Sequence, residues 1–168
     1  MSNKTTVVMG VLVLGILGLF LWGSQSRATL PDRDRQDRPS KSVLTVVEPL
    51  HDLGTISMAQ GTVDTTFEIA NPTKKDIVLE SLTTSCMCTT AFIVKGDARR
   101  GPFGMPGHGG PVPKANEIIP AGGTLAINVV YDPAAHGPAG VGTIDRLVYL
   151  QDDTGNVLEL EIRANVTP

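Results

Sequence analysis

Residues 62–70 read TVDTTFEIA, and apolar or β-branched side chains alternate there with polar ones. In an extended chain, one face would carry Val63, Thr65, Phe67 and Ile69. Successive side chains of a strand point to opposite faces of a sheet, so a period of two indicates a half-buried strand. This stretch therefore predicts a sheet with one face against a core and the other face in water.

The same pattern recurs in short pieces on both sides of this stretch. Alternating or β-branched runs occupy residues 43–47, 77–82, 124–131, 143–150 and 157–166. Turn-forming residues separate them, as in NPTKKD at residues 71–76 and DDTGN at residues 152–156. No helical periodicity follows residue 23. Seven or so short strands divided by turns predict an all-β fold, an immunoglobulin-like antiparallel β-sandwich.

The alternation also indicates which residues form the core. The residues expected to be buried lie on the apolar faces of their strands, and they are Phe67, Ile69, Leu79, Leu125, Ile127, Val129, Leu147, Leu158 and Leu160. A domain of roughly 125 residues is long enough to bury one such core.

The beginning of the chain has a different character. Residues 7–22 read VVMGVLVLGILGLFLW and contain no charge. The apolar run from Thr5 to Gly23 is close to the roughly 20 residues that a helix needs to cross hydrocarbon. Trp22 stands at its end, where interfacial aromatic residues are common. We expect residues 1–23 to be a transmembrane anchor, with a cleaved signal peptide as the alternative.

Residues 24–42 are polar and carry interleaved charges, as in Asp32-Arg33-Asp34-Arg35. Such a segment buries too little surface to order itself, so we expect a disordered linker to one domain, residues 43–168. By the positive-inside rule, the linker arginines would place that domain in the cytoplasm. An apolar run that opens a chain usually acts as an export signal, however. We therefore expect a single-pass protein of the cytoplasmic membrane with its domain on the extracytoplasmic side.

The composition argues against nucleic-acid binding. The formal net charge is −3, the isoelectric point is near 5.5, and aromatic residues make up 4% of the chain. Nucleic-acid binders usually present a basic face or an aromatic stacking platform. We expect no nucleic-acid partner.

The candidate site begins with Cys86 and Cys88, the two cysteines of the chain. In a strand, residues two apart point to the same face, so both thiols would be presented together. Their Cα atoms would then be about 6.6 Å apart, at the upper edge of what a disulfide tolerates. A bridge between them therefore requires a kink at Met87.

A glycine- and proline-rich loop, expected over residues 95–114, adds Met105 and His108. Two thiolates with a thioether or an imidazole form a soft ligand set, which suits Cu(I) first and Zn²⁺ if His108 and a fourth ligand take part. We predict a metal site of Cys86, Cys88, Met105 and His108. A purely structural cysteine pair is the alternative. His136, in the loop over residues 132–142, is a further imidazole that would reach the same end of a sandwich.

Five short motifs carry a family resemblance. They are HDLGTI at residues 51–56, FEIANPT at 67–73, SCMCT at 85–89, IPAGG at 119–123 and VYDP at 130–133. In this order and spacing they resemble the bacterial family called domain of unknown function 1573, over about residues 46–166. The resemblance implies a Hydin-like or PapD-like immunoglobulin-type sandwich that is exported or membrane-anchored, and it implies no established activity. Met87 departs from the family's usual Cys-Gly-Cys, and the insert 95–114 is longer than usual.

Two hypotheses for function follow. Common enzyme motifs such as Gly-x-Ser-x-Gly and His-Glu-x-x-His are missing, so we expect no enzyme, although a Cys86–His108 nucleophile pair stays open. The first hypothesis is a membrane-tethered binding or assembly module that contacts another envelope protein, for which an open edge strand would serve. The second is a copper- or redox-handling envelope protein that uses the Cys-x-Cys motif with the Met/His loop.

Overall fold

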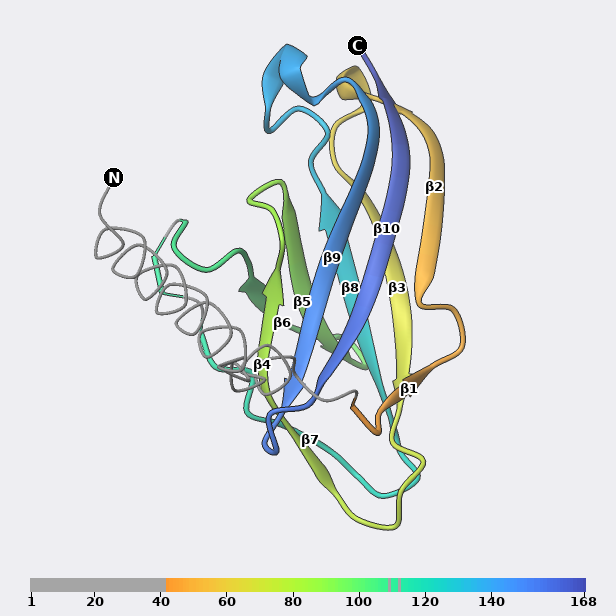
Figure 1. Ribbon diagram of the computed structural model, residues 1–168, viewed down its shortest axis with the longest axis vertical. Coiled ribbons are helices and arrows are strands. Elements are labelled where there is room, and N and C mark those ends of the chain that lie inside the picture. Colours follow the sequence, from red (N-terminus) through yellow and green to blue (C-terminus); the bar gives the residue numbers. More distant parts are fainter. Residues whose placement is uncertain (1–41, 109, 112) are drawn as a thin grey trace, which may run out of the picture. The chain divides into compact units, whose positions relative to one another are not determined.

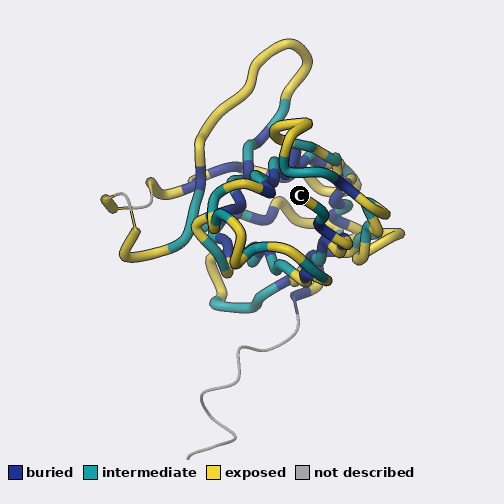
Figure 2. Tube along the Cα trace, turned by 90° about the horizontal axis from the view of Figure 1, so that it is seen from above, coloured by how far each residue is buried: buried dark blue, intermediate teal, exposed yellow. Residues whose placement is uncertain are grey.

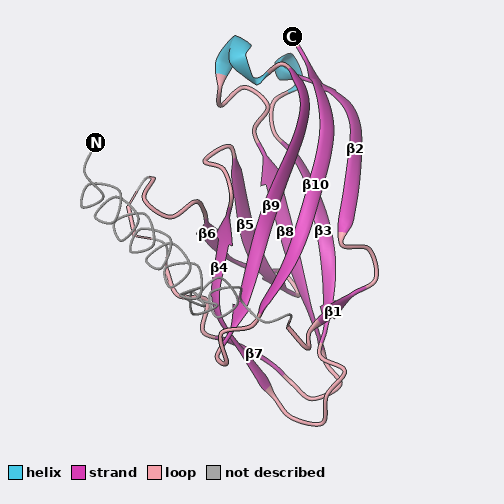
Figure 3. Ribbon diagram, viewed as in Figure 1, coloured by secondary structure: helices cyan, strands magenta, loops and turns pink. Residues whose placement is uncertain are grey.

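The chain folds into two five-stranded β-sheets that pack against each other (Figure 1). The first sheet contains, in spatial order, β1 (Thr45–Val46), β3 (Val63–Ala70), β8 (Thr124–Tyr131), β5 (Thr89–Lys95) and β6 (Ala98–Phe103). The second contains β2 (Leu50–Ser57), β10 (Val157–Thr167), β9 (Gly142–Asp152), β4 (Ile77–Thr84) and β7 (Glu117–Ile119). Two short 3₁₀ helices, η2 (Met58–Gln60) and η3 (Gly137–Gly140), lie at the end of the sandwich near the C-terminus (Figure 3).

This computed structural model describes residues 42–108, 110–111 and 113–168. The expected transmembrane anchor, residues 1–23, and the linker as far as residue 41 lie outside the described residues. Among the residues that are described, no helix is long and apolar enough to span a membrane.

The all-β expectation is confirmed, but the number of strands and their pairing differ from it. Ten strands occur in the described part of the chain, and β2 runs parallel to β10 while the other pairs are antiparallel. The parallel pair arises at the start of the domain, where β1 pairs with β3 in the first sheet. The chain then crosses over at residues 47–49, so that β2 joins the second sheet beside the last strand.

The insert over residues 95–114 is only partly irregular. A loop was expected over its whole length, but its first half forms β6, which pairs antiparallel with β5. The other residues of β6 are exposed, but Phe103 at its end is 1% exposed and anchors the strand to the core there. Gly104 follows, and its carbonyl accepts a hydrogen bond from the Thr84 N–H at 3.2 Å. The rest of the insert therefore starts from a fixed point beside β4.

The core lies between the sheets, and exposed positions dominate the loops that project from them (Figure 2). The predicted core residues are buried with the exception of Leu147, which is half-buried. On β9 the inward positions are Ile144, Val148 and Leu150. Because this strand has apolar residues on both faces, its alternation alone does not determine which face is buried.

Strand β4 changes face along its length. Ile77 and Leu79 point inward, as the alternation predicted. Its register with β9 then shifts between Leu79 and Ser81, and beyond this irregularity Leu82 and Thr84 are the buried residues. Such a bulge re-aims the side chains that follow it. The bulge therefore sets the orientation of the residues that lead into the cysteine motif. As a result, the Thr84 side chain is buried two residues before Cys86.

Candidate functional site

The two cysteines lie in a tight turn between β4 and β5. The Thr89 N–H donates to the Cys86 carbonyl at 3.1 Å, which closes the turn over Met87 and Cys88. The Cα atoms of Cys86 and Cys88 are 5.3 Å apart, and their sulfurs are joined in a disulfide. The expectation of an extended strand was wrong at this point, because the chain must turn here to pass from one sheet to the other. The kink at Met87 that a bridge requires is present.

Hydrogen bonds hold this turn on several sides. The Thr84 hydroxyl donates to the carbonyls of Cys86 and Thr89, at 3.1 and 2.9 Å. The Cys88 carbonyl accepts from the Asp132 N–H at 2.8 Å, and the Ser85 N–H donates to the carbonyl of Leu147 at 2.9 Å. The turn is thus tied to its own strand ends, to the end of β8 and to β9 without help from the disulfide.

The two sulfurs have different surroundings. Cys88 is 3% exposed, whereas Cys86 is half-buried and next to the exposed His136. The Cys86 sulfur lies 3.1 Å from His136 Nε2. The Cys88 sulfur accepts a hydrogen bond from Arg146 Nε–H at 3.3 Å. Positive and hydrogen-donating neighbours favour the thiolate form of cysteine, so each sulfur has a partner that suits its reduced state.

The polar partners come from two other elements. His136 stands immediately before η3, in the loop that leaves β8, and Arg146 stands in the middle of β9. The Asp132 side chain shapes the start of that loop by accepting from the Ala134 N–H at 2.9 Å. One ligand atom each from Cys86, Cys88 and His136 lies within 4.8 Å of the other two. The donors present therefore suit either disulfide chemistry or, after reduction, a soft metal ion.

A shallow hollow opens beside Cys86 and His136. It has a volume of about 660 Å³ and is also lined by charged residues of β9 and β10, namely Asp145, Arg146, Glu161 and Arg163. Arg163 bonds Asp145 at 2.6 Å and Glu161 at 3.0 Å. The hydrogen bond from Arg163 holds the pKa of Asp145 below its ordinary value. The Cys86 sulfur therefore faces a polar surface whose charges largely pair with one another.

The structure divides the four predicted ligands between two places. Cys86 and Cys88 lie with His136, the alternative imidazole, and His108 is not a member of their group. Met105 and His108 line a different hollow, of about 370 Å³, together with Met87. Binding of one metal ion by the four predicted residues stays a prediction. Arg146 was not expected at this site, because nothing in the alternation of residues 143–150 distinguishes it from a solvated strand residue.

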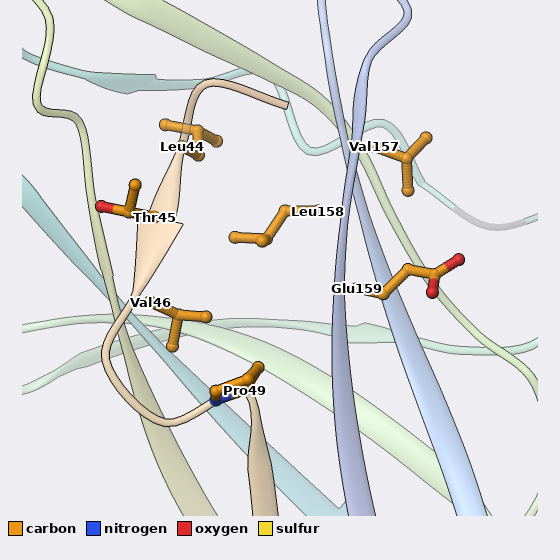
Figure 4. Close-up of a pocket in the computed structure, with 7 residues that line it drawn as sticks. All are labelled: Leu44, Thr45, Val46, Pro49, Val157, Leu158 and Glu159. Atoms are coloured by element: carbon orange, nitrogen blue, oxygen red, sulfur yellow. The ribbon is translucent and has the colours of Figure 1, made fainter. Parts of the chain in front are cut away.

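An apolar hollow lies at the start of the domain, far along the sequence from the cysteines. Its volume is about 490 Å³, and Leu44, Thr45, Val46, Pro49, Val157, Leu158 and Glu159 line it (Figure 4). It occupies the gap between β1 and β10, where the chain passes from one sheet to the other. Val43, Val47 and Leu50 nearby are exposed, and Val47 is 95% exposed. This end of the sandwich therefore presents an apolar patch to solvent.

Comparison with known proteins agrees with the expected resemblance over part of the chain. Residues 44–102 match the family described as protein of unknown function DUF1573. The match includes the cysteine turn and ends before the Met105–His108 segment. No curated protein matches the chain.

Several solved structures are similar in fold. A protein of unknown function from Porphyromonas gingivalis is 17% identical, with a TM-score of 0.53 over 76% of this chain and 48% of that one. The chain thus spans about half the length of that protein. PapD-like domain 7 of human CEP192 is 11% identical, with a TM-score of 0.46, and the match covers 77% of this chain and 89% of that domain. The CupB2 chaperone of Pseudomonas aeruginosa is 10% identical, with a TM-score of 0.39, and the match covers 73% of this chain and 55% of the chaperone. At such identities the likeness concerns the fold alone.

Proposed function

We propose that the chain is a redox-handling envelope protein that exchanges the Cys86–Cys88 disulfide with cysteines of another envelope protein. Residues 1–23 would anchor it in the cytoplasmic membrane, with the domain on the extracytoplasmic side. The observation that carries the proposal is the asymmetry of the two sulfurs. Cys86 is accessible and lies 3.1 Å from His136, while Cys88 is buried and accepts a hydrogen bond from Arg146. Disulfides form and persist in oxidising compartments, which suits this location.

A structural role accounts poorly for this disulfide. A bridge between residues two apart closes a very short loop, and the chain-entropy relation gives it about 1.5 kcal/mol of stabilisation. The turn is already fixed by hydrogen bonds from Thr84, Thr89 and Asp132. An arginine donor aimed at a buried sulfur adds little to an oxidised bridge, whereas it stabilises the thiolate that reduction produces.

The chemistry follows from this asymmetry. In the reduced protein, His136 Nε2 is placed to accept the proton of the Cys86 thiol, and the thiolate attacks one sulfur of the partner's disulfide. That bond breaks, the first partner thiolate leaves, and Cys86 is held in a mixed disulfide. The Cys88 thiolate, stabilised by Arg146, then attacks the Cys86 sulfur and releases the second partner thiolate. Two electrons pass from the cysteine pair to the partner, and the reverse sequence oxidises a partner dithiol.

Oxidised glutathione serves as the probe of this order of attack. The full-length Cys88→Ser protein, reduced and then mixed with glutathione disulfide, is expected to form a stable mixed disulfide at Cys86 because no second sulfur releases it. The Cys86→Ser protein should react at least about 100-fold more slowly, since Cys88 is 3% exposed. Acid quenching and mass spectrometry measure both rates. Equal rates in the two variants, with thermal unfolding unchanged, would rule out the assignment of Cys86 as the attacking sulfur.

The apolar hollow between β1 and β10 favours a second candidate, a binding or assembly module for another envelope protein. Exposed Val47 and Leu50 beside this hollow are the kind of surface that marks a contact site. A photo-crosslinking residue placed at Val47 in cells should give an adduct with one envelope protein. The same residue at Lys74, in an exposed turn between β3 and β4, is the matched control. Identical adducts at both positions, or none at either, would remove this candidate.

A further inference from the structure

A second group of soft side chains lies beside the cysteine turn, and the redox chemistry above does not use it. Met87 is 53% exposed although it is a large apolar residue. It lines the hollow of about 370 Å³ that Met105 and His108 also line. Cys86 and Met87 are adjacent in sequence, but they line different hollows. The turn therefore presents a sulfur to each of two surfaces.

The second half of the insert is shaped so that Met105 and His108 come together. Residues 105–108 form a turn in which the His108 N–H donates to the Met105 carbonyl at 3.4 Å. Pro106 fits the second position of such a turn, and Gly107, with a φ of +83°, fits the third. In a turn of this kind the first and last Cα atoms are less than about 7 Å apart. The two side chains thus start from neighbouring points on the rim of the hollow.

The insert is also held against the cysteine turn. Phe103 is buried in the core, and the Gly104 carbonyl accepts from the Thr84 N–H at 3.2 Å, one residue before Met105 and two residues before Cys86. Met105 is half-buried and His108 is exposed. Both segments that supply the group are therefore anchored to the end of β4. Hydrophobic packing explains Met105 in part, but it does not explain Met87, which has more than half its surface in water.

We propose that Met87, Met105 and His108 form a binding site for a soft monovalent cation, Cu(I), that is separate from the disulfide. Two thioether sulfurs and an imidazole nitrogen are ligands that select Cu(I) over hard cations such as Mg²⁺ and Ca²⁺. All three ligands are neutral when they bind, so the site needs no thiolate and operates while Cys86 and Cys88 are oxidised. This separates it from the four-residue site expected from the sequence, and it does not depend on the proposed redox exchange.

The test uses the full-length protein in detergent with its disulfide intact. It is titrated with Cu(I) kept reduced by ascorbate in competition with a chromophoric Cu(I) chelator, and in parallel with Ag(I), a redox-inert ion of the same charge. We expect one ion to bind per chain, and Ag(I) to shift the side-chain methyl resonances of Met87 and Met105. Met87→Leu and Met105→Leu, which keep volume and remove sulfur, should each weaken binding at least 10-fold.

Three further variants make the test specific. His108→Asn should weaken binding as the methionine changes do. Met58→Leu is the matched control, because Met58 lies in η2, outside the group, and it should leave the affinity unchanged. The Cys86→Ser/Cys88→Ser protein should bind as well as the wild type. The proposal would be overturned if the oxidised protein bound no ion, or if Met87→Leu and Met105→Leu bound it as tightly as the wild type. Loss of binding in the double cysteine variant alone would also overturn it.

Discussion

Two tight turns of this domain, the β9–β10 hairpin at residues 152–156 and the cysteine turn at residues 86–89, are held in different ways. In the hairpin, buried Asp152 accepts hydrogen bonds from the Thr154 N–H and hydroxyl, the Asn156 N–H and the Ser42 hydroxyl, at 2.6–3.1 Å. Its side chain is fully engaged in holding the loop. In the cysteine turn, backbone groups and Thr84 hold the chain, and both sulfurs remain available to His136 and Arg146. The hairpin therefore depends on one side chain for its shape, whereas the cysteine turn is held mainly by groups other than its two sulfurs.

The largest effect is expected from the hairpin. Asp152→Ala removes the buried acceptor of four hydrogen bonds and leaves the buried Ser42 hydroxyl without this partner, so it should lower the free energy of unfolding by about 3 kcal/mol at neutral pH. Urea denaturation measures this change. A loss below about 0.5 kcal/mol, the size of an ordinary surface substitution, would show that the hairpin does not depend on its aspartate.

The cysteine turn should respond less. The Cys86→Ser/Cys88→Ser protein should lose about 1.5 kcal/mol, because a loop this short contributes little chain entropy. The same denaturation experiment, run beside Asp152→Ala, gives the comparison directly. A loss larger than that of Asp152→Ala would mean that the disulfide is structural, and the contrast between the turns would fail.

The pH dependence of the free energy of unfolding shows how much of the Asp152→Ala effect comes from the charge of the carboxylate. Burial alone raises the pKa of Asp152, but hydrogen bonds from Thr154, Asn156 and Ser42 outweigh it and hold the pKa below its ordinary value. A lowered pKa in the folded state gives stability that is present above the unfolded pKa of about 3.9 and is lost as the pH falls through the folded pKa. The stability gap between wild type and Asp152→Ala should be constant from about pH 5 to 8 and narrow below about pH 4. A gap that widens in acid would contradict this sign.

Local alternation predicted much of the fold, because a half-buried strand repeats every two residues. It identified the inward faces of β3 and β8 correctly. It failed where apolar residues occupy both faces, as at Leu147, and where a bulge reverses the parity within β4. The parallel pairing of β2 with β10 depends on contacts between the two ends of the domain, which no local pattern encodes.

The candidate site was less predictable for a related reason. The cysteine pair and the requirement for a kink at Met87 are properties of adjacent residues, and both were visible in the sequence. His136 and Arg146 reach the sulfurs from positions 50 and 58 residues farther along the chain. Spacing alone also favoured Met105 and His108 as partners of the cysteines. The structure places them with Met87 because the turn directs neighbouring side chains to different surfaces.

The reduction potential of the Cys86–Cys88 pair, measured in full-length protein equilibrated with glutathione redox buffers, tests the central claim most directly. If Arg146 and His136 stabilise the reduced form, the pair should titrate reversibly as a two-electron couple with a potential above about −270 mV. Arg146→Gln should make the potential more negative, because the Cys88 thiolate loses its donor. A potential below about −300 mV, typical of structural disulfides, together with no change in Arg146→Gln, would contradict the account.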